Sequence, residues 1–572
     1  MKKYFGSFLL FLFLSNYLHS QDLGESYLSE WRKIYPSKAL NSGIRSYVFQ
    51  YEEFSSEQLK DWVDYNRQIL ADLSNGQAMI GPIDGRLLRV QMQSEIDKWQ
   101  LLSTHTTSLR LYAQLISKAI PSIFEADYLL APEKSRLVCN RLQAMEKLSM
   151  SAKVNLKNVS KGNLEKGITD IKKSIQYVKK DLQKDLESNG LTTTCLNFDL
   201  QLRRTIQSLE ALKEHCTSTL SKITKEEKTL IGKEEFDRRL KLYTDSDLTS
   251  TTLAEMALQE IEVTKGLMAS VSKEYLLSTY PNEHLPKEET DIIKRALADM
   301  EKDAPLNAEE YLEFWQQLAA DAANFIQEND IATLPKYKTL RIQTAPESAG
   351  PAARIGWVDA APPFAPNPIT TLYLPSIPDT LPRQEQIDFW ASFNRPFNRM
   401  IAIHELLPGH YMQLKISRET AHPIRLVFPY GPYIEGWATF TEKVLLDAGW
   451  EAGNHLTYLA HLRKRLENAN RTYTSVQAHC HGWSKEQVKQ FSIETSLLAP
   501  QFAKSLWGRI ERSPMQLTSY YYGGAQFTEL LKKEKERLGT SFNLKSFMDI
   551  IMIAGPIPVD EFYSIFKQTY PK

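Results

Sequence analysis

The 572-residue sequence has little cysteine, no excess of charge and no apolar run long enough to span a membrane. Lysine plus arginine and aspartate plus glutamate number 69 each, so the formal net charge is zero. A balanced charge without a long basic run argues against nucleic acid as a partner. Gly/Ser-rich linkers, internal repeats and low-complexity stretches are also missing, which predicts one continuous body rather than separate modules.

An apolar run from about Phe5 to Leu14 follows two lysines at the N-terminus. This order is typical of a secretory signal peptide, and the run is about half of the ~20 residues that a membrane span needs. No cysteine stands directly after it, which argues against a lipid anchor on cysteine. We therefore expect residues 1–20 to be a signal peptide cleaved near Ser20, with export to the periplasm or beyond and no stable membrane span afterwards. An uncleaved amphipathic N-terminus is the alternative.

The four cysteines are Cys139, Cys195, Cys216 and Cys480, and none forms a CxxC pair. A cysteine zinc site therefore has little support, whereas an exported chain permits disulfides. Cys195 and Cys216 bracket a predicted helix whose rise of ~1.5 Å per residue separates them by about 30 Å, too far to bond. If either is bridged, Cys139 is the favoured partner.

The spacing of apolar residues predicts a mainly α-helical fold. Between about Ser55 and Gln327 most of the chain is amphipathic, and steps of three and four separate Ile168, Ile171, Ile175, Val178 and Leu182. After about Ala332, "YKTLRIQTAP", "ARIGWVDAAP" and "ITTLYLPSI" are short β-prone runs separated by prolines. We expect a helical N-terminal region (21–331) and a second region (332–572) with one small sheet beside the helix that carries residues 404–410, both packed as one body.

The segment "HELLPGH", residues 404–410, is the first candidate metal site. It begins like the zinc-peptidase signature His-Glu-x-x-His, in which two histidines bind the ion. The segment is otherwise apolar, and buried imidazole and carboxylate groups need partners, which zinc can supply. Glu405, adjacent to the ligand His404, is then the residue that deprotonates a water. The alternative is a core helix with incidental histidines.

The spacing within this segment departs from the signature, because His410 follows His404 by six positions instead of four. Six residues turn a regular helix by about 120°, so a straight helix could not aim both rings at one ion. The inserted Pro408 removes a backbone hydrogen bond, and Gly409 tolerates unusual backbone shapes. We therefore predict a kink or π-like bulge that turns His410 back toward His404.

The stretch "YIEGWATFTEKVLL" carries a narrow polar stripe on an otherwise apolar predicted helix. Glu435, Thr439 and Glu442 fall at i, i+4 and i+7, on one face. Gluzincin-type zinc peptidases take a glutamate ligand from a second helix, and Glu435, 25 residues after His410, suits that role. Thr439 and Glu442 are predicted to orient the ligands. A buried salt bridge between Glu435 or Glu442 and an arginine is the alternative.

The C-terminal third offers groups that could stabilise an oxyanion. "QAHCHGW" carries His479 and "SYYYGGAQF" carries Tyr520, and a tyrosine hydroxyl or imidazolium near a metal can play this part. Ordinary packing is the alternative for both. Four arginines are candidates for gripping a substrate carboxylate, and the sequence does not rank them: Arg465, Arg471, Arg509 and Arg512.

Taken together, His-Glu-x-x-Pro-Gly-His, Glu-Gly-Trp-Ala, His-x-x-Gly-Trp, Ser-Tyr-x-x-Gly and the tail "GPIPVDEF" resemble the bacterial family known as domain of unknown function (DUF) 885. The resemblance runs from roughly Leu40 to the C-terminus. It implies a mainly helical, gluzincin-like fold, zinc on His404, His410 and Glu435, and Glu405 as general base, with Tyr520 and His479 at matching positions. The family's acidic residue four before that histidine is Ser475 here, which weakens any relay through it.

The sequence thus predicts an exported zinc metallopeptidase that hydrolyses small peptides through a metal-activated water. One alternative is a non-catalytic peptide-binding or envelope structural protein on a peptidase-like scaffold, although the intact Glu405 speaks against it. Another is a zinc amidase acting on cell-wall peptide, which would use the same site.

Overall fold

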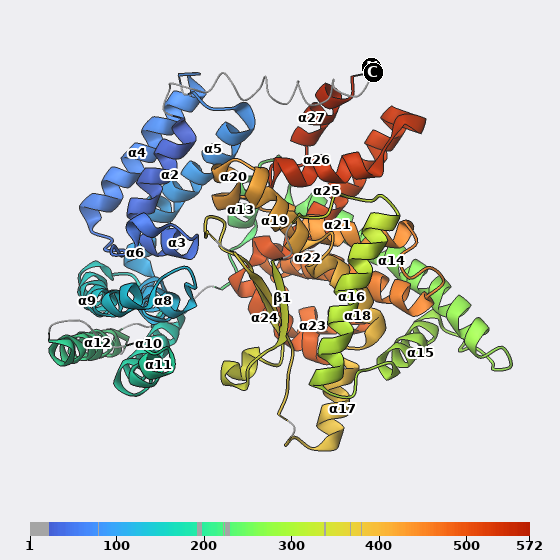
Figure 1. Cartoon of the computed structure of the whole chain (residues 1–572), viewed down its shortest axis with the longest axis horizontal. Coiled ribbons are helices and arrows are strands. Elements are labelled where there is room, and N and C mark those ends of the chain that lie inside the picture. Colours follow the sequence, from blue (N-terminus) through green and yellow to red (C-terminus); the bar gives the residue numbers. More distant parts are fainter. Residues whose placement is uncertain are drawn as a thin grey trace. The chain divides into compact units, whose positions relative to one another are not determined.

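The computed structural model describes residues 22–77, 79–191, 197–220, 222, 229–336, 339–366, 368–378 and 380–571. Over these residues the protein is mainly helical with one small sheet, as predicted (Figure 1). The predicted signal peptide lies outside them. No helix in this part of the chain is both long and apolar enough to cross a membrane. The chain divides into two compact units, Met1–Glu227 and Lys228–Lys572, so the boundary expected at residue 332 falls inside the second unit.

The first unit consists of amphipathic helices. The apolar residues expected on one face, Ile168 to Leu182 at steps of three and four, are all buried. They lie on α10, the π-helical turn η3 and α11, which follow one another without a break. The elements of this unit are α2 (Leu23–Ile34), α3 (Pro36–Asn41), η1 (Arg45–Tyr47), α4 (Ser56–Ser74), α5 (Pro82–Ile96), η2 (Asp97–Leu101), α6 (Thr104–Thr107), α7 (Leu109–Lys118), α8 (Pro121–Glu125), α9 (Ala131–Asn155), α10 (Lys161–Gln176), η3 (Tyr177–Asp181), α11 (Leu182–Ser188) and α12 (Phe198–Leu220).

The cysteines follow the expectation from helix geometry. Cys139 on α9 is disulfide-bonded, whereas Cys216 on α12 and Cys480 are free thiols. Cys195 lies outside the described residues. Cys216 therefore does not bond along its own helix, as the rise per residue predicts.

The second unit holds the small sheet and the remaining helices. Its elements are α13 (Lys233–Thr244), α14 (Ser250–Thr279), α15 (Glu289–Lys302), α16 (Ala308–Glu328), β1 (Leu340–Thr344), η4 (Glu347–Ala352), β2 (Trp357–Asp359), β3 (Thr370–Leu374), α17 (Arg383–Ala391), α18 (Arg395–Glu405), α19 (His410–Thr420), α20 (Pro423–Val427), α21 (Tyr433–Asp447), α22 (His455–His481), α23 (Lys485–Glu494), α24 (Pro500–Arg512), α25 (Pro514–Leu538), η5 (Gly539–Ser541), α26 (Leu544–Ala554) and α27 (Glu561–Thr569).

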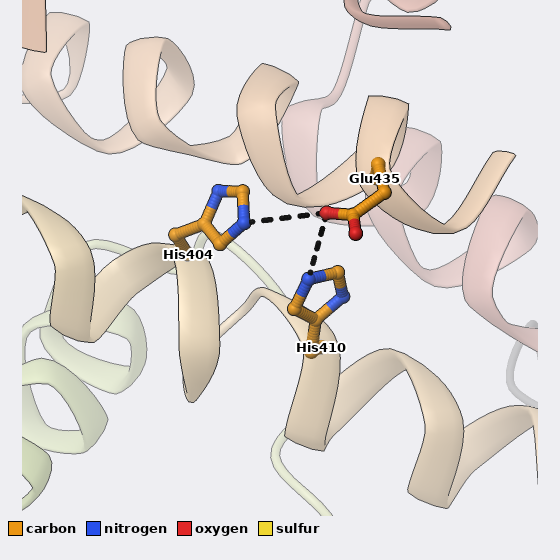
Figure 2. Close-up of side chains that lie close together, drawn as sticks. All are labelled: His404, His410 and Glu435. Atoms are coloured by element: carbon orange, nitrogen blue, oxygen red, sulfur yellow. Dashed lines mark ion pairs between the residues drawn. The ribbon is translucent and has the colours of Figure 1, made fainter. Parts of the chain in front are cut away.

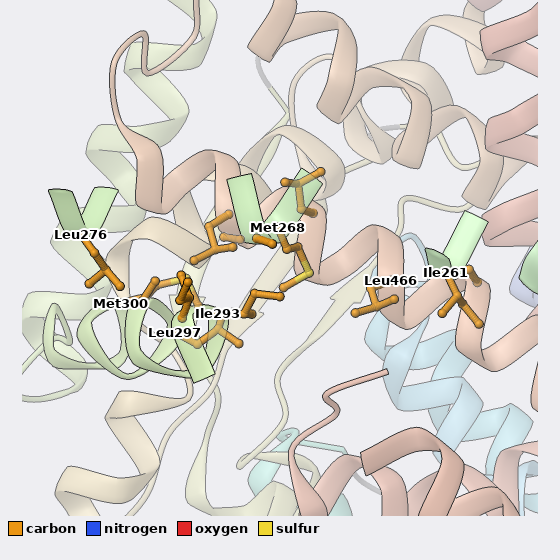
Figure 3. Packing of buried hydrophobic residues seen from close by; sticks show 14 residues of the cluster. Ile261, Met268, Leu276, Ile293, Leu297, Met300 and Leu466 are labelled. Atoms are coloured by element: carbon orange, nitrogen blue, oxygen red, sulfur yellow. The ribbon is translucent and has the colours of Figure 1, made fainter. Parts of the chain in front are cut away.

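A buried apolar cluster joins α14, α15 and α22 (Figure 3). Met268 of α14, Met300 of α15 and Leu466 of α22 are each at most 1% exposed. The long helix α22 also packs against α18, α21 and α25. α22 therefore connects this core to α18 and α21, two of the three helices that carry the candidate ligands.

The three β-prone runs form the predicted sheet, in the order β1-β3-β2. β1 pairs with β3 in parallel, and β2 pairs with β3 antiparallel, with Trp357 stacked on Tyr373 across the pair. The Thr339 N–H, just before β1, donates to the Tyr411 hydroxyl of α19 at 3.0 Å. The sheet therefore adjoins the helix that begins at His410, as the sequence predicts.

Candidate functional site

The helix carrying His404 ends one residue later, and a new helix begins at His410. The N–H of Leu406 makes the last regular bond of α18, to Ala402, and the N–H of Gly409 reaches back to the Ile403 carbonyl at 3.0 Å. A Cβ on Gly409 would overlap the carbonyl oxygens of Ile403 and His404, so only glycine permits this close turn. The His410 ring lies 4.8 Å from the His404 ring between centroids, so His410 does turn back toward His404, through a full break between two helices and not through the predicted kink or bulge within one.

Three predicted ligands from three helices converge at this break (Figure 2). His404 is the last residue but one of α18, His410 is the first residue of α19, and Glu435 lies in the first turn of α21. The Glu435 Oε2 lies 3.6 Å from the His404 Nε2 and 3.3 Å from the His410 Nε2. One ligand atom from each residue lies within 4.8 Å of the others.

These separations agree with the size of a zinc site. Zinc binds imidazole nitrogen at ~2.0–2.1 Å and carboxylate oxygen at ~2.0–2.2 Å, so neighbouring ligand atoms of a tetrahedron lie roughly 3.3 Å apart. The two nitrogen–oxygen distances to Glu435 are 3.3 and 3.6 Å. A donor set of two imidazoles and one carboxylate is that of a catalytic zinc site with a free fourth position. The residues present therefore fit the ion.

A buried chain of hydrogen bonds holds His404 from its other side. Its Nδ1 lies 2.8 Å from Glu442 Oε1, and the second oxygen of Glu442 lies 2.9 Å from the His461 Nδ1. Glu442 and His461 are at most 1% exposed. A carboxylate on the far nitrogen orients a ligating histidine, so the predicted role of Glu442 agrees with its position. His461 on α22 was missed, because it lies outside the polar stripe and no spacing links it to the ligands.

The charges in this cluster shift one another's pKa values. Burial alone would lower the pKa of His404, but the Glu435 and Glu442 carboxylates raise it to about 10. Burial alone would raise the pKa of Glu442, but its hydrogen bonds with His404 and His461 hold it at about 2. Contacts with both ligand histidines likewise lower the pKa of Glu435, against burial. Without metal, the cluster therefore carries a proton on His404 at neutral pH.

Zinc binding is accordingly expected to release about one proton at pH 7.5, because zinc takes neutral imidazole and His404 is protonated below its pKa of about 10. Apparent zinc affinity should rise with pH, by up to about tenfold per unit, and level off above that pKa. Calorimetric titrations in buffers with different ionisation enthalpies measure the released proton. A binding enthalpy that does not vary with the buffer would contradict this prediction.

Glu405 is half-buried at the end of α18, next to His404. Its negative charge contributes to the raised pKa of His404, so the carboxylate lies within electrostatic reach of that ring. Among the described residues it makes no hydrogen bond or ion pair. A carboxylate beside the ligands that is not engaged elsewhere can accept a proton from a water there.

Tyr520 reaches the site because α21 and α25 cross at glycines. A Cβ on Gly523 would overlap the carbonyl oxygen of Pro432 and lie 2.8 Å from the Gly436 Cα, so the two backbones touch. Tyr520 stands about one turn before Gly523, and Glu435 adjoins Gly436. Burial and then the Glu435 carboxylate raise the pKa of Tyr520. Its hydroxyl therefore remains a proton donor at neutral pH, beside a predicted ligand.

The structure does not show the predicted role of Thr439. Thr439 packs against Gly524, and its hydroxyl is buried without a hydrogen-bond partner among the described residues, so its predicted ligand-orienting role is not observed.

Tyr243 on α13 donates to the Gly431 carbonyl at 2.9 Å. Burial and the Glu435 charge raise its pKa to about 12. The sequence gave no signal for Tyr243, which lies far upstream of the motifs.

The structure does not bring His479 into the cluster. Its Nδ1 accepts from the Ile231 N–H at 3.2 Å, which leaves its Nε2 to donate to the Ile510 carbonyl at 3.0 Å. Its ring lies against Phe236, and burial lowers its pKa. Because both ring nitrogens are hydrogen-bonded to the main chain, His479 links its own helix to the segments at Ile231 and Ile510, as the packing alternative predicts. It is not free to bind a substrate oxygen.

Fold and site together define a mainly helical protein with a two-histidine, one-glutamate centre. The chain belongs to the family described as "Bacterial protein of unknown function (DUF885)", which matches residues 36–563. The family resemblance inferred from the motifs is thus confirmed.

Two solved structures share the fold. One is described as a putative lipoprotein of unknown function from Shewanella oneidensis, with 18% identity, a TM-score of 0.81 and coverage of 95% of this chain and 98% of that chain. The other, a putative lipoprotein from Colwellia psychrerythraea, has 16% identity, a TM-score of 0.71 and coverage of 96% and 98%. No curated protein matches the chain.

Proposed function

We propose that this protein is an exported zinc metallopeptidase, a gluzincin-like hydrolase that cleaves small peptides. The observation that carries the proposal is the convergence of His404, His410 and Glu435, whose ligand atoms lie within 4.8 Å of one another, with Glu405 next to His404 in the chain. The sequence brings these residues together only by breaking a helix at Pro408 and Gly409.

Bound zinc would supply Lewis acidity, which lowers the pKa of water and polarises a carbonyl. Glu405 would accept a proton from the attacking water and pass it to the leaving amine. Glu442 keeps the His404 ring in the orientation that directs Nε2 to the centre. Tyr520, protonated at neutral pH, would donate to the oxyanion that forms on the attacked carbonyl.

The recessed position of the cluster supports small substrates. The side chains of His404, His410 and Glu435 are 4%, 14% and 20% exposed. A short or flexible peptide can reach such groups more readily than the surface of a folded protein can.

Export is supported by the order of charge and apolar residues in the first 20 positions. Two proteins of the same fold, both from bacteria, are described as putative lipoproteins, and lipoproteins are exported. The export that we propose is therefore through a signal peptide cleaved near Ser20.

The protein purified with zinc is expected to hold about one equivalent of the ion and to cleave members of a mixed peptide library, as read by mass spectrometry. A chelator should abolish cleavage, and added zinc should restore it. Less than about half an equivalent of zinc, together with no chelator-sensitive cleavage, would contradict the proposal and favour a peptide-binding protein. Cleavage confined to cell-wall peptides would identify an amidase instead.

A further inference from the structure

Two arginines lie against the ring of Tyr520. The Cζ of Arg471 on α22 is 5.2 Å from the ring centroid, and that of Arg509 on α24 is 5.9 Å from it. Both guanidinium groups oppose the rise in the pKa of Tyr520. One tyrosine side chain therefore contacts the ligand Glu435 through its hydroxyl and two cations through its ring.

These two arginines differ in how their charge is neutralised. Arg471 is 9% exposed and pairs with the Glu467 carboxylate, while its Nη1 donates to the Asn468 Oδ1 at 3.2 Å. Arg509 is partly exposed and makes no ion pair or hydrogen bond with any residue that the structure describes. Its charge helps to lower the pKa of Glu467, but that carboxylate is already bound to Arg471. The Arg509 guanidinium is therefore a positive charge whose N–H donors are available to a ligand.

The structure thereby ranks the four candidate arginines. Arg465 is engaged with Glu260 at 2.6 Å. Arg512 is exposed at the end of α24, where its guanidinium folds back over Gly508 of the same helix. Of the four, Arg509 alone combines contact with Tyr520 and a free guanidinium.

We propose, as an extension of the peptidase function, that Arg509 binds the C-terminal carboxylate of the substrate, so that the site releases one or two residues from the C-terminal end of a peptide. A guanidinium holds a carboxylate through two parallel hydrogen bonds. The Tyr520 side chain sets the distance from the metal cluster to this anchor, and each extended residue spans about 3.3–3.6 Å, so few residues fit between them. In the hydrolysis one water is consumed. The C–N bond breaks, the water oxygen completes a new carboxylate, and both protons of the water end on the amine, which leaves as an ammonium group.

The test compares one peptide with a free C-terminal carboxylate with the same peptide as its C-terminal amide. Binding is measured by calorimetry to the zinc-loaded Glu405→Gln variant, which prevents turnover. We expect the acid to bind about 10- to 100-fold more tightly than the amide, the range for a charged hydrogen-bonded pair. Adding Arg509→Ala, or Arg509→Gln as a second variant, should bring the two affinities within about threefold of each other. Arg512→Ala on the same helix is the matched control and should keep the preference.

Kinetics on the enzyme without the Glu405 substitution give a second readout. Arg509→Ala should raise KM for the acid about 10-fold or more with a smaller change in kcat, because the lost contact is present in the bound ground state. Mass spectrometry should show one or two residues leaving from the C-terminal end.

Equal affinity for acid and amide, no binding of either, or a preference that survives both Arg509 variants would overturn the carboxylate assignment. The assignment would also be overturned if acetylation of the peptide N-terminus abolished binding while amidation of its C-terminus had no effect. If the acid preference depends on Arg509 but no peptide is hydrolysed, the carboxylate assignment stands and the proposed peptidase function fails. If peptides are cleaved internally and amidation has no effect, the peptidase function stands and the carboxylate assignment fails.

Discussion

Replacing Glu405 by glutamine is expected to lower peptide hydrolysis by about 100- to 10,000-fold while zinc stays bound, which is the range for loss of a general base. Glutamine keeps the size of the side chain but cannot accept the proton of the attacking water at neutral pH. Glu405 makes no hydrogen bond or ion pair in the described part of the chain, so its neutralisation should leave the fold intact.

Initial rates on a peptide cleaved by the unsubstituted protein, with zinc content from metal analysis, measure both parts of this prediction. Glu419→Gln is a matched control, because Glu419 is exposed on α19 and pairs with Lys415 away from the cluster. Full activity in the Glu405 variant would exclude the mechanism. Loss of zinc along with activity would instead place Glu405 among the ligands.

Replacing Glu442 by glutamine is expected to weaken zinc binding by about 10- to 100-fold, the usual effect of losing the partner that orients a ligating histidine. Glu442 is fully buried and accepts from both His404 and His461. A glutamine side chain has one acceptor oxygen, so its NH₂ group would face one of the two rings. Because a buried polar group then loses its partner, the melting temperature should also fall.

Competition against a chromophoric chelator measures the zinc affinity, and thermal unfolding with and without zinc measures the stability. Lys443→Gln on the same helix is the control, since Lys443 is partly exposed and contacts Asp447. A zinc affinity within about twofold of the unsubstituted protein would show that Glu442 does not orient the ligand.

Local patterns predicted much of the fold. Apolar residues from Ile168 to Leu182 recur at helical spacing and are buried, since one face of an amphipathic helix must pack against its neighbours. The proline-bounded runs near residues 340, 357 and 370 form the three strands. The division of the chain between residues 227 and 228 was not predicted, because amphipathic helices continue on both sides of it and only contacts distant in sequence separate the units.

For the candidate site, the sequence alone predicted the candidate ligands and the helix break that brings them together. Four polar residues stand out because the sequence around them is apolar: His404, Glu405, His410 and Glu435. The pair Pro408-Gly409 predicts a break in the helix.

Only the tertiary structure decided which other groups join them. Glu442 and His461 come into contact because α21 packs on α22. Tyr520 approaches Glu435 where α21 and α25 cross at glycines. The ring nitrogens of His479 are hydrogen-bonded to main-chain groups instead. The sequence around a histidine or tyrosine does not show whether its side chain faces the candidate metal site or a main-chain carbonyl. Its partner lies on another helix, so the helix packing, and not the local pattern, sets its role.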